Sequence, residues 1–186
     1  MKVLLGISNR HIHLNEEDYK ILFKDQKMEN IRDLVQPEQF ASNLLVDIKT
    51  EKGVLNKVRV LGPLRSYTQV ELSRTDCYKL GIEPPVRESG DLEGASTVTI
   101  VSPYGELTKN CAIIANRHIH ITKELREKYN LYQDKVKIKI NGEKGAILEN
   151  VYLKETEKAA LELHLDTDDA NAVNLKNKDM VEIITD

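Results

Sequence analysis

The sequence of 186 residues predicts a mainly β fold of the barrel or sandwich type. Short apolar or alternating segments recur along the chain, and turn residues separate them. Helical patterning is confined to four short stretches, at 15–24, 74–80, 122–129 and 167–173. No glycine-rich phosphate loop of the GxGxxG or GxxxxGK[ST] type is present, which disfavours a Rossmann or P-loop nucleotide-binding fold.

Apolar or alternating runs predict the strands. Val3–Ile7 comes first, and Leu44–Ile48 and Val54–Leu61 follow with a turn at Lys52-Gly53 between them. The remaining strands are expected at 68–72, 97–101, 111–115, 135–140, 146–153, 160–165 and 180–184. Pro103-Tyr104-Gly105 and Asn141-Gly142 are turn sequences that predict hairpins.

Composition excludes several classes of partner. The net charge is -3, and acidic and basic residues are mixed, without the basic block that nucleic-acid binding requires. The apolar runs are too short to cross a bilayer, and the N-terminal run is too short for a signal peptide. We therefore expect a cytoplasmic protein with no nucleic-acid or membrane partner. Cys77 and Cys111 form no CxxC pair and are expected in the core.

An internal repeat is the clearest feature of the chain. Ser8-Asn9-Arg10-His11-Ile12-His13-Leu14 returns as Ala115-Asn116-Arg117-His118-Ile119-His120-Ile121. Each copy follows a β-prone stretch and precedes a candidate helix N-cap, Asn15 or Thr122. The same unit of strand, metal-compatible turn and short helix therefore occurs twice, which indicates a duplication or two pseudo-equivalent halves.

The His-x-His spacing favours metal binding. Residues i and i+2 share one face of a strand but lie roughly 200° apart around a helix, so both imidazoles can converge on one ion only in extended backbone. Zinc binds neutral imidazole, and catalytic zinc keeps three protein ligands with an open position. The candidate ligands are all five histidines, His11, His13, His118, His120 and His164. Two copies of the motif favour this interpretation over histidines that only form hydrogen bonds in turns.

Other polar residues allow two interpretations each. Glu71 lies among apolar residues and is either a metal ligand or a solvated residue of an edge strand. Arg65, after Gly62-Pro63-Leu64, is either an anion clamp or a surface arginine. Ser89-Gly90-Asp91 is a turn that can meet a phosphate. Asp166, Asp168 and Asp169 are better explained as charges at a helix N-terminus than as ligands.

Taken in order, these motifs resemble the phosphate propanoyltransferases, the PduL-type phosphotransacylases of bacteria. The resemblance covers nearly the whole chain. It rests on 8–14, Gln36-Pro37, 58–63, Arg65, 68–71, Thr75-Asp76, 80–82, 85–87, 89–91, 114–120, 164–168 and 170–172.

The resemblance implies a fold and an activity. The fold is a pair of small β-barrels capped by short α-helices, with the active site at their junction. The domains are then a central barrel, 10–115, and a discontinuous second barrel, 1–9 plus 116–186. The activity is transfer of a short acyl group, propionyl or acetyl, between coenzyme A and inorganic phosphate, as in propanediol degradation.

The resemblance also implies roles for individual residues. One zinc is held by His11, His13 and Glu71, and a second by His118, His120, His164 and water. Arg65 binds phosphate and is catalytic, with Ser89 nearby. Ser8, Arg59, Leu61 and Asn171 correspond to coenzyme A contacts, and Tyr78 to a residue that stacks on the adenine of a neighbouring subunit. A homo-oligomer, dimeric or larger, is implied.

Two departures from the family pattern leave these ligands in place. Members inside bacterial microcompartments carry an N-terminal targeting helix, whereas this chain begins at its first strand, so a free cytoplasmic enzyme is expected. Glu38 and the segment 93–96 differ from glycine-richer versions. The alternatives are a zinc hydrolase of esters or thioesters and a non-catalytic metal-binding module. Arg65 favours the transferase, and Co²⁺ or Ni²⁺ can also occupy such imidazoles.

Overall fold

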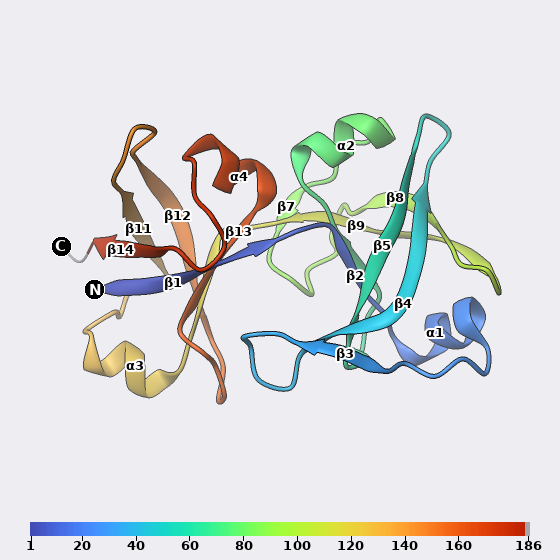
Figure 1. The fold of residues 1–186 in the computed structure, drawn as a ribbon, viewed down its shortest axis with the longest axis horizontal. Coiled ribbons are helices and arrows are strands. Elements are labelled where there is room, and N and C mark those ends of the chain that lie inside the picture. Colours follow the sequence, from blue (N-terminus) through green and yellow to red (C-terminus); the bar gives the residue numbers. More distant parts are fainter. Residues whose placement is uncertain (185–186) are drawn as a thin grey trace. The chain divides into compact units, whose positions relative to one another are not determined.

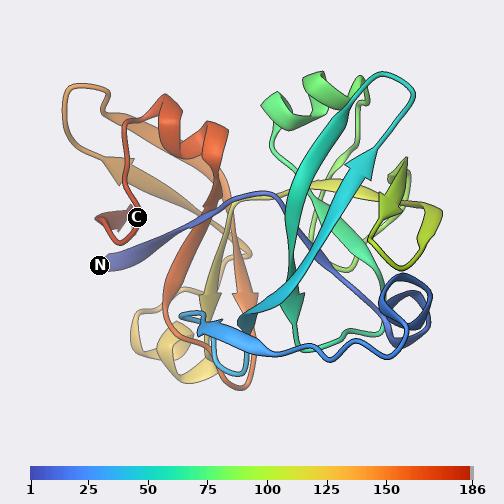
Figure 2. The ribbon, with the colours of Figure 1, turned by 45° about the vertical axis from the view of Figure 1, so that its right-hand side comes forward.

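The computed structural model describes residues 1–184 and shows a mainly β protein with short helices (Figures 1 and 2). The helices are α1 Glu16–Phe23, α2 Arg74–Leu80, α3 Lys123–Lys128 and α4 Thr167–Ala172. Each lies within a stretch where helix is expected, so the predicted fold class is confirmed. Among the described residues no helix is both long and apolar enough to span a membrane.

Residue contacts divide the chain into two compact units. Unit 1 contains Met1–Ser8, Val35–Pro37 and the chain from Asn116 onward, and unit 2 contains Asn9–Leu34 and Glu38–Ala115. Each unit has its own hydrophobic core. Each also closes its own six-stranded barrel, so the structure selects barrels over a sandwich.

The barrel of unit 1 runs in the order β1-β13-β10-β12-β11-β14 and closes through the antiparallel pair of β14 with β1. Its strands are β1 Lys2–Ser8, β10 His118–Ile121, β11 Lys135–Ile140, β12 Ala146–Glu155, β13 Glu162–Asp166 and β14 Met180–Ile184. β11 shows how the sequence determines which side chains face the barrel interior and which face outward. Its valine and isoleucines are buried and its three lysines are exposed, as strict alternation requires.

The barrel of unit 2 closes in the order β4-β5-β2-β6-β9-β8 and back to β4. Its strands are β2 His11–His13, β4 Phe40–Lys49, β5 Val54–Gly62, β6 Gln69–Glu71, β8 Ser96–Val101 and β9 Glu106–Ala115. β3 Asn30–Asp33 adds to β4, and β7 Val86–Arg87 adds to β9. Side chains of β2, β5, β6 and β9 fill the core, among them Ile12, Val60, Val70 and Ala112.

The two barrels are equivalent strand by strand, which confirms the pseudo-equivalent halves expected from the repeat. β2 pairs in parallel with β5 and antiparallel with β6, and β10 pairs in the same way with β12 and β13. β9 pairs in parallel with β6, and β1 pairs in parallel with β13. Because β6 and β13 are equivalent, β9 corresponds to β1. The strand before each histidine motif therefore belongs to the other unit, because β1 leads into β2 and β9 leads into β10.

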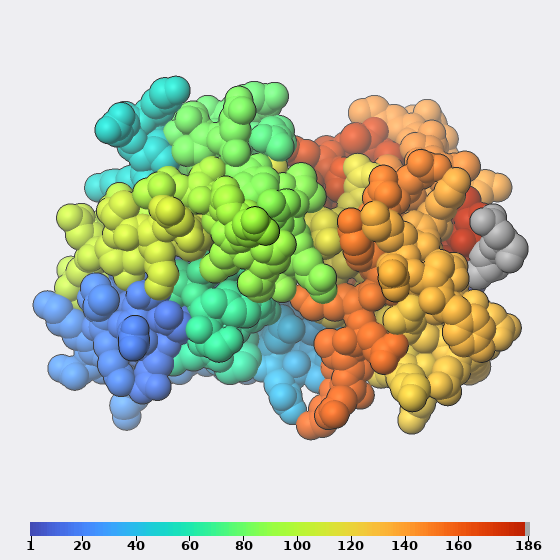
Figure 3. Space-filling model, turned by 180° about the vertical axis from the view of Figure 1, so that it is seen from behind, coloured from blue at the N-terminus to red at the C-terminus, as the bar shows by residue number. Residues whose placement is uncertain are grey.

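Local turn and cap signals are confirmed. Asn15 and Thr122 are the N-caps of α1 and α3 and accept bonds from backbone N–H groups three residues ahead. Both expected hairpins form. In the second, Gly142 has a φ of 126°, a conformation that glycine adopts without strain. Figure 3 shows α1, in blue, beside the yellow-green hairpin of β8 and β9, where Ser102 Oγ donates a hydrogen bond to the carbonyl oxygen of Leu22.

Three local expectations were wrong or incomplete. The extended backbone that the His-x-His spacing requires is confirmed, but these residues form short strands of their own, β2 and β10, and not the turn expected after the preceding strand. The motif needs a strand because neighbouring strands on both sides satisfy its backbone groups. β3 and β7 were not predicted. All four residues of β3 are exposed, so it has no apolar alternation, and β7 has only two residues.

Candidate active site

Strand register brings three ligand-type side chains together in unit 2. His11 and His13 belong to β2, and in the antiparallel pair with β6 the residue opposite His11 is Glu71. The two imidazole rings meet edge to face with centroids 5.0 Å apart. One nitrogen or oxygen atom from each of the three residues lies within 4.8 Å of the other two, and all three side chains are buried. These are the three residues assigned to the first zinc by resemblance.

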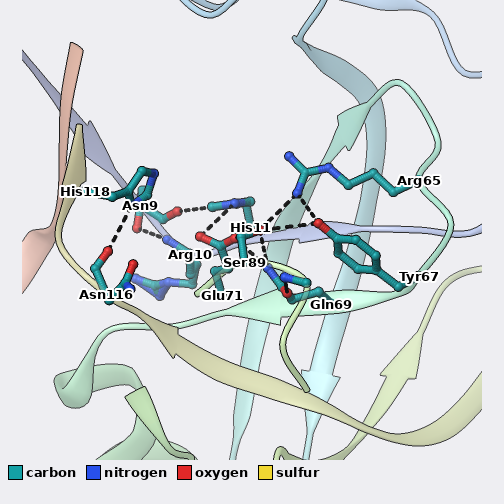
Figure 4. Close-up of polar contacts among 11 residues, drawn as sticks. Asn9, Arg10, His11, Arg65, Tyr67, Gln69, Glu71, Ser89, Asn116 and His118 are labelled. Atoms are coloured by element: carbon teal, nitrogen blue, oxygen red, sulfur yellow. Dashed lines mark hydrogen bonds and ion pairs between the residues drawn. The ribbon is translucent and has the colours of Figure 1, made fainter. Parts of the chain in front are cut away.

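The backbone fixes the tautomer of His11. Its Nδ1 lies 2.8 Å from the carbonyl oxygen of Asn9, which can only accept a hydrogen bond (Figure 4). Nε2 therefore faces Glu71, whose Oε2 is 3.4 Å away. Burial lowers the pKa of His11, but the Glu71 carboxylate outweighs burial and the net pKa lies above its usual value. The pair is therefore arranged to share a cation, either a proton or a metal ion.

Unit 1 repeats this construction with a third histidine. In the antiparallel pair of β10 with β13, the residue opposite His118 is His164. The rings of His118, His120 and His164 are mutually edge to face, with centroid separations of 4.6 to 5.1 Å. Their candidate ligand atoms also lie within 4.8 Å of one another. His118 Nδ1 donates to the carbonyl oxygen of Asn116 at 2.9 Å, as His11 does to Asn9.

Both triplets fit zinc by the chemistry of their donors. Imidazole and carboxylate are ordinary zinc ligands, and ligand atoms about 2.0–2.1 Å from a tetrahedral ion lie about 3.3–3.5 Å apart. The separations of up to 4.8 Å need only small side-chain movements to reach that geometry. Three ligands in each triplet leave one position for water or substrate.

The arginine of each motif fixes the motif to a helix. Arg117 binds both oxygens of Asp169, at 2.8 and 2.7 Å, and Arg10 lies 3.2 Å from Asp76. Asp169 and Asp76 stand in the first turns of α4 and α2. Asp166 is the N-cap of α4 and accepts from the backbone N–H of Asp169. Asp168 also lies in the first turn of α4, so the expectation that Asp166, Asp168 and Asp169 are charges at a helix N-terminus is confirmed.

Arg65 lies beside the unit 2 triplet in a hydrogen-bonded group (Figure 4). Its Nη1 donates to Tyr67 OH at 2.9 Å and to Ser89 Oγ at 3.0 Å, and Ser89 Oγ donates to Glu71 Oε1 at 3.2 Å. Within residues 1–184, Nε and Nη2 of Arg65 make no hydrogen bond to the protein. The guanidinium is thus anchored by one nitrogen and presents the other edge, which is the edge that binds an oxyanion in two places.

Sequence reasoning missed three polar residues of these sites: Tyr67, Gln69 and Glu162. Gln69 Nε2 donates to Glu71 Oε1 at 2.6 Å, and His164 Nε2 lies 2.8 Å from Glu162 Oε2. Burial raises the pKa of Glu162, but the hydrogen bond and charge of His164, together with the hydrogen bond from Gln36 and the charge of His118, outweigh burial, and the net pKa is lowered. The available signal was spacing, because Gln69 and Glu162 each stand two residues before a ligand, on the same face of its strand.

The residues expected to contact coenzyme A are distributed over both units. Ser8 ends β1, and Asn171 is exposed on α4. Arg59 and Leu61 are alternate, half-buried residues of β5, and Arg59 Nη1 donates to the carbonyl oxygen of Ser42 at 2.8 Å. Tyr78 is 79 % exposed on α2, as an aromatic ring that stacks on an external partner needs to be. Among the residues predicted to bind phosphate or coenzyme A, Arg65 and Ser89 lie beside the candidate metal triplet of unit 2.

Comparison with known proteins assigns the chain to a protein family. The phosphate propanoyltransferase family matches residues 4–176. A phosphate propanoyltransferase of Thermotoga maritima is 44 % identical over 187 residues, which is 98 % of this chain and 89 % of that protein. One from Escherichia fergusonii is 46 % identical over 176 residues, 93 % of this chain and 84 % of that protein. The expected resemblance is confirmed, and the chain belongs to the phosphate propanoyltransferase family.

Proposed function

We propose that this protein is a zinc-dependent phosphotransacylase, which interconverts a short-chain acyl-coenzyme A plus phosphate with an acyl phosphate plus coenzyme A. The observation that carries the proposal is the connection of Arg65 to a metal-binding triplet. Ser89 Oγ accepts from Arg65 and donates to Glu71, so an oxyanion clamp and a metal ligand share one hydroxyl. The names of the relatives support the same activity.

Arg65 binds and orients phosphate in this proposal. The two bonds through Nη1 prevent rotation of the guanidinium plane, and Nε and Nη2 hold two phosphate oxygens. The same positive charge stabilises the negative charge that develops on the thioester oxygen. Because Tyr67 and Ser89 hold the group in place before substrate arrives, little of its rotational freedom remains to be lost on binding.

Each triplet would hold one zinc ion in this proposal: His11, His13 and Glu71 would hold the first, and His118, His120 and His164, with water, the second. Bound zinc supplies Lewis-acid stabilisation of negative charge on phosphate and on the departing thiolate. The residues fix its ligands in advance, since the Asn9 and Asn116 carbonyls set the tautomers of the first histidine in each triplet.

The acyl group passes directly to phosphate. A phosphate oxygen forms the new bond to the thioester carbon, the carbon–sulfur bond breaks, and coenzyme A departs as a thiolate. Among the described residues both cysteines are buried, and burial raises the pKa of Cys111 to about 12. Ser89 Oγ accepts hydrogen bonds from Arg65 and Gln69, which lowers its nucleophilicity. The two cysteines and Ser89 are therefore not prepared to carry an acyl group.

Ser8, Arg59, Leu61 and Asn171 bind coenzyme A in this proposal, and Tyr78 stacks on the adenine of a neighbouring subunit in a dimer or larger homo-oligomer. We propose a cytoplasmic enzyme of short-chain acyl metabolism such as propanediol degradation. Acetyl and propionyl groups differ by one methylene, which is worth about 1–3 kcal/mol in an apolar pocket. Both are therefore expected as substrates.

The decisive experiment measures loss of propionyl- and acetyl-coenzyme A with and without phosphate, before and after chelation and zinc reconstitution. We expect turnover that requires both phosphate and metal. Turnover that is independent of phosphate would instead identify a zinc hydrolase. Tight zinc binding without turnover would identify a binding module. Acyl group trapped on the protein in the absence of phosphate would overturn the direct route.

A further inference from the structure

Two buried polar side chains occupy the same place in both barrels, next to the metal triplets but outside them. Gln69 lies opposite His13 in the β2–β6 pair, and Glu162 lies opposite His120 in the β10–β13 pair. Gln69 is 0 % exposed and Glu162 is 4 % exposed. Burial of such groups is unfavourable unless their hydrogen bonds are made, so their partners explain why they are there.

Gln69 uses its amide to hold the ligand carboxylate. Nε2 donates to Glu71 Oε1 at 2.6 Å and to Ser89 Oγ at 2.9 Å, and Oε1 accepts from the backbone N–H of Gly90 at 2.7 Å. Both amide protons and the carbonyl oxygen are therefore engaged. With Oε1 of Glu71 held in this way, Oε2 is the oxygen that faces His11 Nε2.

Glu162 uses its carboxylate to hold the ligand imidazole. Oε2 accepts from Gln36 Nε2 at 2.7 Å and lies 2.8 Å from His164 Nε2. A carboxylate accepts the Nε2 proton, which leaves Nδ1 as the nitrogen that can bind a metal.

The neighbouring strand makes room for Glu162. Gly6 stands beside His164 in the β1–β13 pair, and a Cβ there would lie 2.4 Å from Glu162 Oε1. The residue at the corresponding position beside Glu71 is Ile113, which is fully buried. Unit 1 therefore has a space for this carboxylate at a position where unit 2 carries a full side chain.

We propose that Gln69 and Glu162 are paired positioning residues, each chemically matched to the third metal ligand of its own barrel. An amide donor supports the carboxylate of Glu71, and a carboxylate acceptor supports the imidazole of His164. This inference rests on the proposed metal sites and adds a rule to them: the supporting residue must change type when the ligand changes type. Gln69 also holds Ser89 and Gly90, so it positions the partner of Arg65, whereas the hydrogen-bond partners of Glu162 within residues 1–184 are Gln36 and His164.

The test compares two variants with matched surface controls. E162Q removes the charge that holds His164, and Q69E places a second carboxylate against Glu71. E157Q and Q26E make the same chemical changes at exposed positions in the same units. Zinc affinity is measured by chelator competition, and the coordination of Co²⁺ by its visible spectrum. H118A/H120A and H11A/H13A backgrounds isolate the unit 2 and unit 1 sites, respectively.

We expect E162Q to weaken zinc binding in unit 1 by about 10–100-fold and Q69E to do so in unit 2, because loss of outer hydrogen-bond partners has effects of this size. Each variant should leave the other site and the fold of the metal-free protein unchanged. Q69E should also raise the KM for phosphate, which E162Q should not do. Unchanged affinities, or equal weakening of both sites by either variant, would overturn the proposal.

Two further variants keep the test sharp if a single substitution disturbs folding. G6A displaces the Glu162 carboxylate without removing it and should weaken only the unit 1 site. Q69E/E71H/I113G rebuilds the unit 1 pair in unit 2 together with the space that Gly6 provides, and it should recover zinc affinity lost in E71H/I113G and in Q69E/I113G. No effect of G6A, or no recovery in the triple variant, would contradict the matched pairing. A wild-type protein that binds no zinc would instead refute the metal part of the proposed function.

Discussion

Unit 1 and unit 2 share the strand register around their histidine pairs and differ in what surrounds it. Both contain the motif strand, the bond from histidine to the asparagine carbonyl, and the arginine bound to the first turn of a helix. Unit 2 adds a longer connection between α2 and β8, residues 81–95, which carries Ser89. The corresponding connection of unit 1, residues 173–179, is short. The candidate metal-ligand triplet is thus present in both units, whereas the hydrogen-bonded group of Arg65, Tyr67 and Ser89 lies in unit 2.

Arg65 gives the strongest way to test this difference. Lys158 is its counterpart in unit 1, since each residue stands six positions before the third ligand of its triplet. We expect R65M to reduce phosphate-dependent turnover by about 10²–10³-fold, because one preorganised charged donor in an active site contributes this much. K158M should retain activity within a few-fold. Steady-state kinetics at varied phosphate checks both, and comparable losses in the two variants would refute the asymmetry.

Removal of one metal ligand from each barrel tests the duplication itself. H13A and H120A should each reduce bound zinc from two ions to one, as measured by elemental analysis of the purified protein. A ligand at 1,000 times its Kd stabilises the folded state by about 4 kcal/mol, so each variant should also lose part of the zinc-induced rise in Tm. A variant that retains both ions, or that loses both, would show that the two triplets are not independent sites.

Substitution of the motif arginines should lower the free energy of unfolding by small amounts that differ between the two units. Arg117 makes a bidentate pair with Asp169, whereas Arg10 makes one contact of 3.2 Å with Asp76. We expect R117A to lower the free energy of unfolding by about 1–2 kcal/mol and R10A by less than about 1 kcal/mol. Urea denaturation of the zinc-loaded protein measures both values. The reverse order would mean that the repeated arginine serves different purposes in the two barrels.

Alkylating reagent and substitution at the cysteines should have the smallest effect on the protein. With a pKa of about 12, the Cys111 thiol stays protonated at pH 8, and it becomes a nucleophilic thiolate only as the pH approaches that value. Cys77 is equally buried, in a position where unit 1 carries Ala170. We expect no alkylation of the native protein by iodoacetamide at pH 8 and unchanged activity in C77A. Mass spectrometry would reveal modification, with urea-unfolded protein as the positive control.

Sequence predicted best the features that depend on neighbours along the chain. The caps at Asn15 and Thr122 and the turn at Asn141-Gly142 are local signals, and the helices and hairpins follow from them. His-x-His spacing indicated paired ligands, but the partners Glu71 and His164 were identified through the family pattern. Their positions depend on register between strands far apart in sequence. Gln69, Glu162 and Tyr67 each contact a residue two positions away. Their other partners, Ser89 and Gln36, lie far away in the sequence, and no local pattern shows those contacts.

The strand before each histidine motif belongs to the other unit, and this has a consequence for synthesis of the chain. The strands of unit 2 all lie between His11 and Ala115, so its barrel can close once this stretch has left the ribosome. Unit 1 pairs β1, which precedes all of unit 2 in the sequence, with β14, which follows all of it. β1 therefore stays without this partner until residues 180–184 have been made, and the barrel that carries the three histidines closes later than the barrel of unit 2.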